Sequence, residues 1–287
     1  MKIILSRKGF DSSYGGIASP ILPDGRMISF PIPSPDDAAT LADISCPDLD
    51  VGKLIGDLSK GKHSIQTRIH LDPDLNRRAA SRLSGWRPSL GQTGAAQSHL
   101  SGMGVGVGDV FLFFGWFRNV EQYGGNWRYV RNAPDLHTIF GWIEIAEVLP
   151  IVLQRTQCLE RHPWIANHPH VASPIYYDNP RNTLYVACER SAFSENAQFG
   201  GGNFARFNES LRLTKLGESR SVWSLPSWFA PNGRNPLSYH PNASSWQEDG
   251  DKVTLRSAAK GQEFVIDSAL YPELEHWATS IVESGSQ

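Results

Sequence analysis

The sequence has little cysteine, no long apolar run and no excess of charge of either sign. Its three cysteines, Cys46, Cys158 and Cys188, lie far apart in 287 residues. An odd, scattered set excludes a disulfide framework and a cysteine-rich zinc site, so we expect buried thiols in a reducing compartment. No apolar stretch approaches the length of a membrane span, and residues 1–8 hold too short an apolar core for a signal peptide. The sequence therefore predicts a cytoplasmic protein that does not enter a membrane.

The balance of charge limits the kind of partner. Lys and Arg total 27 against 29 Asp and Glu, which gives a formal net charge of −2. Proteins that bind long DNA or RNA draw much of their affinity from basic side chains on phosphates, so bulk charge does not favour that footprint here. A local basic groove is still compatible with this net charge. The sequence also has no Walker loop, no Gly-x-Ser-x-Gly elbow, no His-Glu-x-x-His and no Cys-x-x-Cys.

Aromatic residues are abundant, and apolar runs of strand length recur along the chain. Nine Trp, eight Tyr and thirteen Phe, with 26 Gly and 19 Pro, indicate a loop-rich fold with aromatic-lined surfaces. Apolar runs predict strands at 3–5, 69–71, 105–118, 138–150, 182–188, 252–255 and 263–267. We further expect a hairpin over 19–33, short helices within 36–60, a polar aromatic loop over 123–129 and an amphipathic helix over 272–283. The fold class predicted is α+β: a mixed, strand-dominated single domain over residues 1–287 with peripheral helices.

Two polar clusters sit at the ends of predicted strands. The run Ser6-Arg7-Lys8-Gly9-Phe10-Asp11 follows the first strand. Its planar guanidinium, its ammonium and its glycine suit recognition of a phosphate or nucleotide, although a solvated strand end with a surface ion pair is the alternative. Glu263 begins a late strand, where a carboxylate can act as a general base or stabilise an oxocarbenium ion, or can simply be solvated.

Three histidines lie in one short stretch, at His162, His168 and His170. Imidazole is the commonest side-chain donor to zinc and iron, and a His-x-His pair can present two donors on one side of an extended segment. Asp72 or His70 could complete a two-histidine, one-carboxylate set. Because His-Pro and Pro-His steps favour irregular loops, the residues alone favour a structural or substrate-facing loop. A metal site built from His168, His170 and Asp72 is the alternative.

The motifs at 1–13, 23–26, 108–117, 162–170 and 261–265 together resemble the bacterial nucleotide modification associated domain family, third type. The resemblance covers nearly the whole chain. It implies an enzyme of nucleotide or nucleic-acid base modification, with a transferase reaction favoured, and it names no cofactor. Its implied partners are a nucleotide or nucleic-acid base and other proteins of a base-modification operon. The motif positions become site candidates: Ser6, Arg7 and Lys8 for substrate binding, and Asp11, Glu263, His168 and His170 for catalysis.

Two partial resemblances bear on mechanism. Residues 108–113 followed by 140–148 look like the paired strands of PUA- and ASCH-type barrels, which implies a barrel-like portion over 100–190 with Trp116 and Trp142 as walls of a base pocket. Residues 262–265 with Arg7 are similar to the arginine-and-glutamate pairing of DNA-directed ADP-ribosyltransferases.

Three functions therefore stay open. The first is an enzyme acting on a nucleotide or flipped base in an aromatic, polar-lined pocket, which the lack of basic character favours over a long nucleic-acid footprint. The others are a non-catalytic PUA/ASCH-like module that binds a modified base, and a metal-dependent oxygenase or hydrolase that uses the histidine loop. In the enzyme, we expect Arg7 and Glu263 to meet across one recess lined by aromatic rings.

Overall fold

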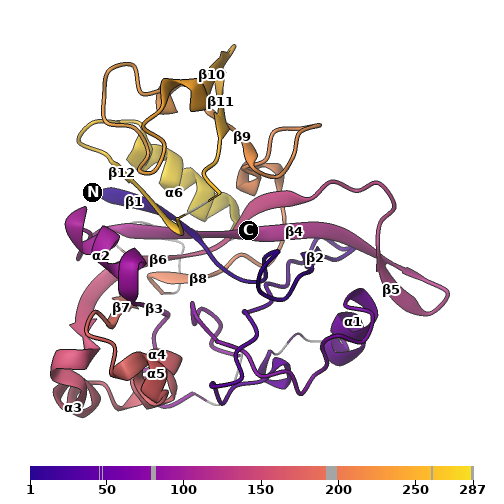
Figure 1. The fold of residues 1–287 in the computed structure, drawn as a ribbon, viewed down its shortest axis with the longest axis vertical. Coiled ribbons are helices and arrows are strands. Elements are labelled where there is room, and N and C mark those ends of the chain that lie inside the picture. The colour runs from indigo at the N-terminus through magenta and orange to yellow at the C-terminus, as the bar shows by residue number, and fades with distance from the viewer. Residues whose placement is uncertain (45, 47, 79–81, 192–198, 260, 286–287) are drawn as a thin grey trace.

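Two long, mainly apolar strands, residues 110–123 and 136–150, form the centre of the fold. The computed structural model describes the chain except residues 45, 47, 79–81, 192–198, 260 and 286–287 (Figure 1). The described strands are β1 (Lys2–Arg7), β2 (Ser19–Ile21), β3 (Ser89–Gln92), β4 (Val110–Tyr123), β5 (Asn126–Tyr129), β6 (Leu136–Pro150), β7 (Thr183–Ala187), β8 (Gly201–Asn203), β9 (Val222–Pro226), β10 (Trp246–Asp249), β11 (Lys252–Arg256) and β12 (Glu263–Asp267).

The helices are short and lie around these strands. The α-helices are α1 (Val51–Leu58), α2 (Gly94–Gly102), α3 (Ile151–Arg161), α4 (Pro169–Ala172), α5 (Pro174–Tyr177) and α6 (Leu274–Gly285). The 3-10 helices are η1 (Leu41–Asp43), η2 (Pro163–Asn167), η3 (Glu209–Leu211), η4 (Ser227–Phe229) and η5 (Ala243–Ser245). Among the described helices, none is long and apolar enough to cross a bilayer. The predicted α+β class, dominated by strands with peripheral helices, is confirmed.

A mixed sheet of nine strands runs through the molecule in the order β12-β1-β4-β6-β7-β3, with β2 and β5 paired to β4 and β8 paired to β6. Strand β1 is parallel to β4 and antiparallel to β12. The barrel expected over 100–190 is wrong: β4, β6 and β7 from that region form the middle of an open path through the described strands, whose ends are β12 and β3. The region cannot close on itself because β1, from the start of the chain, occupies the free edge of β4.

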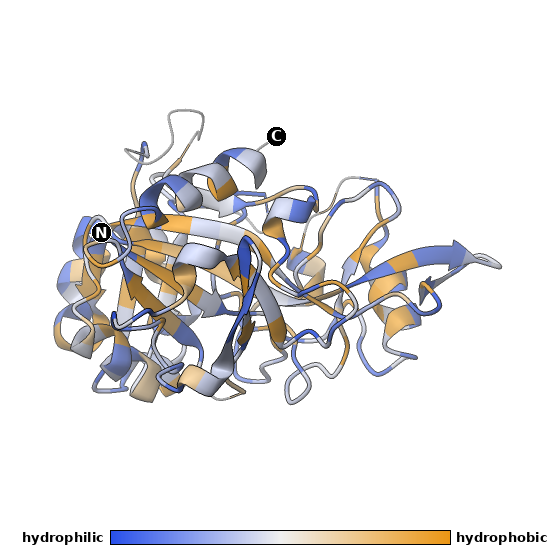
Figure 2. Cartoon of the chain, turned by 90° about the horizontal axis from the view of Figure 1, so that it is seen from above, coloured by the Kyte–Doolittle hydropathy of each residue, from blue (hydrophilic) through white to orange (hydrophobic). Residues whose placement is uncertain are grey.

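Alternation along the strands gives the sheet two buried faces. On β1, Ile3 and Leu5 pack in one apolar cluster with residues of β9, β11 and α6, whereas Ile4 packs in another with Phe111 and Phe113. Figure 1 shows the first layer, drawn in orange and yellow, above the sheet, and shows α3, α4 and α5 with the loops of the N-terminal half below it. Figure 2 shows the apolar strands inside the molecule and the polar outer end of the β4–β5 hairpin extending from it.

Two elements differ from the prediction. Residues 123–129, expected as a loop, form the β4–β5 hairpin around Gly124 and Gly125, both of which have positive φ. Glycine adopts this backbone conformation at no steric cost, so the pair closes a two-residue turn. Loop-forming residues predicted the turn but not the pairing of the strands on either side of it. The expected strand at 69–71 is reduced to a single bridge between Pro33 and Ile69, because the amides of Ile69 and His70 bond to carbonyl oxygens of two different segments, at Ala39 and Ile32.

The buried histidine of β6 gives a test of the core. His137 accepts a hydrogen bond from Nε1 of Trp223 at 3.1 Å. Burial, together with the nearby charges of Arg7 and Arg220, holds the pKa of His137 well below its usual value. The folded protein therefore keeps this imidazole neutral where the unfolded chain takes up a proton.

We predict that the free energy of unfolding falls more steeply with decreasing pH in the wild-type protein than in His137→Gln. Below about pH 6.5 the unfolded state binds the extra proton, which removes up to about 1.4 kcal/mol per pH unit. Glutamine can still accept the Trp223 hydrogen bond but does not titrate. Urea unfolding at pH 7.5, 6 and 5 measures the two slopes. Parallel slopes would show that His137 is protonated equally in both states.

Candidate active site

A cleft of about 660 Å³ opens at the carboxyl end of β1. Ligand sites of α/β sheets commonly lie outside the carboxyl ends of strands, and pockets for small molecules have about this volume. The cleft is bordered by the turn after β1, the end of β3, the segment before β12 and helices α4 and α5. Its lining includes Arg7, Lys8, Gly9, Asp11, Tyr14, Asp36, His70, Asp72, Gly91, Gln92, Thr93, His170, Tyr176 and Gln262.

The two edges of the open sheet are joined beside this cleft by one carboxylate. Oε1 of Glu263, on β12, accepts hydrogen bonds from Nζ of Lys8 at 3.0 Å and from Nε2 of Gln92, on β3, at 2.7 Å. The Glu263 side chain is 1 % exposed, and its Oε2 has no hydrogen-bond partner among the described residues. Lys8 and Gln92 line the cleft. Glu263 therefore lies behind the lining and holds two lining residues in place.

Arg7 lies at the rim and points to the other face of the sheet. Its guanidinium donates to the carbonyl oxygens of Ala258 and Ala259, at 2.7 and 3.0 Å, and lies 5.8 Å from the ring centroid of Phe114. Burial lowers the pKa of Arg7, with Asp11 opposing that shift. Arg7 and Glu263 thus occupy adjacent strands at the same end of the sheet without facing each other across the cleft.

The two tryptophans proposed as walls do not line the cleft. Trp142 is 2 % exposed and packs in the apolar cluster under α6. Trp116 is half-buried, with the guanidinium of Arg220 4.1 Å from its ring centroid. Alternation on β4 and β6 turns both rings toward the face opposite the cleft. The aromatic rings of the lining are instead Tyr14 and Tyr176.

Two other predicted residues have mainly local contacts. Oδ1 of Asp11 accepts hydrogen bonds from the backbone amides of Ser13 and Tyr14, at 2.7 and 2.6 Å, and so closes the turn after β1 at the cleft rim. Ser6 is fully buried, and its Oγ has no hydrogen-bond partner in the described part of the chain.

A buried cluster of two histidines and an aspartate forms the opposite wall. His70, Asp72 and His170 are 6 %, 8 % and 3 % exposed, and one nitrogen or oxygen of each lies within 4.8 Å of the others. Nδ1 of His70 is 2.8 Å from Oδ2 of Asp37, and Nδ1 of His170 is 2.7 Å from Oδ1 of Asn182. Each ring is therefore held by its Nδ1, which leaves its Nε2 for the cleft.

The protonation states of this wall follow from burial and close pairing. Burial alone would raise the pKa of Asp72, but the imidazole of His168, 3.4 Å away, and the rings of His170 and His70 hold that pKa well below the usual range. Burial lowers the pKa of His170 to about 3. At neutral pH the wall thus presents an ionised carboxylate beside a neutral imidazole.

His168 supports this wall from behind. Its Nδ1 accepts from the amide of His170 at 3.3 Å, which caps α4, and its Nε2 lies 3.4 Å from Oδ1 of Asp72. It does not line the cleft. The expected irregular loop is in fact the two short helices η2 and α4, each beginning with a proline, because proline fits the first position of a helix.

Sequence reasoning missed several residues that position this wall. Asp37 and Asn182 orient the imidazoles, and Gly91 donates its amide to Oδ1 of Asp72 at 2.6 Å. A Cβ on Gly91 would lie 2.2 Å from the ring of His170, so only glycine leaves room for that ring. The histidine stretch at 162–170, with His70 or Asp72 as a further ligand, pointed to the wall itself, but no sequence signal pointed to these supporting residues.

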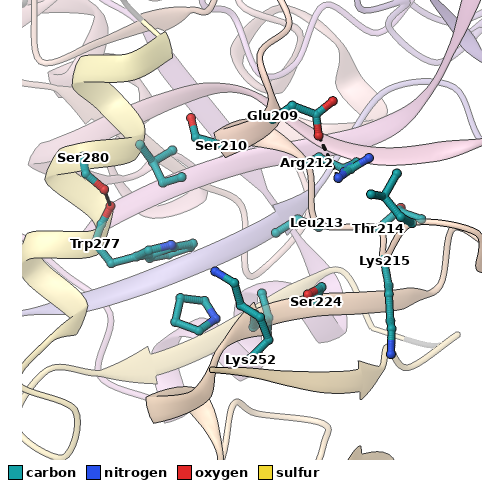
Figure 3. Close-up of a pocket in the computed structure, with 14 residues that line it drawn as sticks. Glu209, Ser210, Arg212, Leu213, Thr214, Lys215, Ser224, Lys252, Trp277 and Ser280 are labelled. Carbon is teal, nitrogen blue, oxygen red and sulfur yellow. Dashed lines mark hydrogen bonds and ion pairs between the residues drawn. The ribbon is translucent and has the colours of Figure 1, made fainter. Parts of the chain in front are cut away.

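A second cavity, of about 470 Å³, lies between α6, β9 and the segment 209–216 (Figure 3). Of the three cations that line it, Arg212 and Lys215 are paired with Glu209 and Asp249, and Lys252 is the third. The residues that line it include no histidine and no aspartate. It therefore has fewer side chains suited to proton transfer or metal binding than the cleft at β1.

Comparison with known protein families identifies the family of the chain. A family model described as nucleotide modification associated domain 3 matches residues 2–267. The chain belongs to this family. No curated protein and no solved structure matches it. The family description connects the chain with nucleotide modification, and the matched range includes every residue of the cleft lining.

The contacts of Glu263 predict a large coupling energy. Lys8→Met leaves this buried carboxylate without its cation, which we expect to cost about 3 kcal/mol of unfolding free energy. In the double variant Lys8→Met/Glu263→Gln the charge is gone, so most of that loss should be recovered. Urea unfolding of the wild type, both single variants and the double variant measures the coupling. Additive losses would contradict a direct interaction.

The contact between Gly91 and His170 predicts that Gly91→Ala destabilises the protein by about 1–3 kcal/mol through overpacking. Gly56→Ala is the matched control, because a Cβ there meets nothing within 4 Å and lies in α1. Alanine favours a helix, so this control should be stabilised by up to about 1 kcal/mol. Chemical denaturation compares the two, and equal effects would show that the ring of His170 does not rest on Gly91.

Proposed function

We propose that the protein is an enzyme that modifies the base of a nucleotide, either free or flipped out of a nucleic acid, in the cleft at the end of β1. One observation carries this proposal: the cation Lys8, with Arg7 at the rim, and the buried cluster of His70, Asp72 and His170 line the same cleft. The first suits a phosphate, and the second suits proton transfer or metal chemistry.

The dimensions of the cleft favour a single nucleotide. A volume of about 660 Å³ accommodates one nucleotide and excludes a duplex. An enzyme that acts on a base within a duplex must first turn it out of the stack. The lining combines Arg7 and Lys8 with Asp11, Asp36 and Asp72, so it is not the continuous basic track that a long strand requires.

The residues can be given distinct roles. Lys8 uses one contact on Glu263, and an ammonium has three donors, so two are left for a phosphate oxygen. Tyr176 stacks on His170 with centroids 4.8 Å apart and offers a base an aromatic surface. Asp11 at the rim and His170 in the wall are the proton-transfer candidates. Glu263 and His168 act as positioning residues, since they contact lining residues rather than the cleft.

An enzyme is favoured over a module that only binds a base. Strongly shifted pKa values within a cleft are common at catalytic sites, and both Asp72 and His170 have them. A recognition module needs no buried carboxylate of this kind beside a neutral imidazole. A transferase reaction and partners from a base-modification operon belong to the same proposal.

We predict that Tyr176→Leu weakens binding of nucleoside monophosphates by about 5- to 150-fold, the loss equivalent to the 1–3 kcal/mol of one base–aromatic stack. Tyr123→Leu is the control, because that tyrosine is 66 % exposed at the tip of the β4–β5 hairpin. Calorimetric titration with the common monophosphates and a short single-stranded oligonucleotide measures both. If none of these ligands binds the wild type, the proposal fails.

Catalysis has a separate test in cells. DNA and RNA from cells producing the wild type, digested to nucleosides and analysed by mass spectrometry, should contain a nucleoside absent from cells producing Asp72→Asn. Identical profiles, together with nucleotide binding by the purified protein, would leave the non-catalytic module as the correct function.

A further inference from the structure

We propose that His70, Asp72 and His170 bind one divalent transition-metal ion, with open coordination positions that face the cleft. The binding of the ion stands on the geometry of these three side chains. Its use in base modification rests on the function proposed above.

The hydrogen bonds around the cluster leave one nitrogen or oxygen atom of each residue available to bind a metal ion. Both imidazoles are held by Nδ1, His70 by the carboxylate of Asp37 and His170 by the amide oxygen of Asn182. A metal-bound histidine usually has a partner of this kind on its far nitrogen, because the partner fixes the ring and makes the Nε2 more basic. Nothing in the described chain hydrogen-bonds to Nε2 of His70 or of His170.

The carboxylate is arranged in the same way. Oδ1 of Asp72 accepts the amide of Gly91, which leaves Oδ2 4.0 Å from Nε2 of His70. That separation is too long for a hydrogen bond. Two imidazoles and a carboxylate that served only to pack the wall would be expected to pair these atoms with one another.

The spacing fits an ion after a small adjustment. Ligand atoms about 2.05 Å from a tetrahedral metal lie about 3.3 Å apart. One ligand atom of each residue lies within 4.8 Å of the others, so side-chain rotations that shorten these separations by up to about 1.5 Å would bring them around an ion. The backbone beneath is fixed at two points, by α4 under His170 and by the Gly91 amide under Asp72.

The donor set selects the class of metal. Two nitrogens and one carboxylate oxygen suit zinc, iron(II) or manganese(II), whereas magnesium and calcium prefer sites made of oxygen alone. Three protein ligands leave positions for water or a substrate oxygen, which distinguishes a catalytic metal from a closed structural site. These positions face the cleft, because all three residues line it.

The test is metal binding by the full chain. Protein treated with chelator and dialysed is titrated separately with Zn²⁺, Mn²⁺, anaerobic Fe²⁺ and Mg²⁺, and bound metal is counted by elemental analysis. We expect about one equivalent of a transition metal, little Mg²⁺, and a metal-dependent rise in melting temperature, since a ligand of the folded state stabilises it. Because this measurement uses the wild-type protein, it does not depend on whether any variant folds. No binding of any of the three transition metals, or no rise in melting temperature, would overturn the proposal.

Variants assign the site. Asp72→Asn and His70→Ala should lose the bound equivalent while keeping a native circular dichroism spectrum. Asp37→Asn keeps an acceptor for His70 and should lower the metal affinity by about 10-fold, because Asp37 orients His70 without contacting the ion itself. His276→Ala, on the exposed side of α6, is the control for adventitious binding and should retain the metal. Loss in the control but not in Asp72→Asn would place the ion elsewhere and overturn the site.

If a variant fails to fold, Co²⁺ on the wild type decides. Its visible bands report a protein site with nitrogen and oxygen ligands, and a spectrum identical to Co²⁺ in buffer would contradict the proposal. Nucleotide binding is measured on the same metal-free protein. A protein that binds the ion but no nucleotide supports this site and overturns the proposed function, whereas one that binds nucleotide but no ion overturns this site alone.

Discussion

The buried carboxylate of Glu263 is the contact on which the cleft depends. An open sheet has two free edges, and here the edge strands β12 and β3 are brought together by the hydrogen bonds from Lys8 and Gln92 to one oxygen of Glu263. A buried charge is costly unless it is paired, so this carboxylate constrains both neighbours strongly. With Gln92 fixed, Gly91 is placed under His170 and beside Asp72. The position of the histidine wall relative to β1 follows from this chain of contacts.

The cleft therefore combines parts of the sequence that are far apart. Lys8 comes from the first strand, His70 and Asp72 from a loop, Gln92 from an edge strand and His170 from a one-turn helix. The family match over residues 2–267 includes all of them, in keeping with a site that needs nearly the whole domain. A nucleotide at Lys8 and an ion at His70, Asp72 and His170 would share this cleft.

Strands and the terminal helix could be predicted because their signals are local. Apolar runs and alternation identify β1, β4, β6 and β12, and the spacing of Leu274, Trp277 and Ile281 identifies α6. The open sheet could not be predicted, since it depends on β1 pairing in parallel with β4 more than a hundred residues later. For the same reason Trp142 looked available in the sequence but is covered by α6 and its neighbours. The sequence suggested His70 only as one of two possible partners of His170. Their proximity depends on the space that Gly91 leaves, and a glycine gives no sequence signal for such a contact.

The most direct measurement of the central claim is a crystal structure of the protein grown with Mn²⁺ or Zn²⁺ and a nucleoside monophosphate, with an anomalous difference map at the metal edge. We expect one peak bounded by Nε2 of His70, Oδ2 of Asp72 and Nε2 of His170, with nucleotide density between it and Lys8. Peaks only at surface residues, or a nucleotide bound in the cavity beside α6, would contradict it.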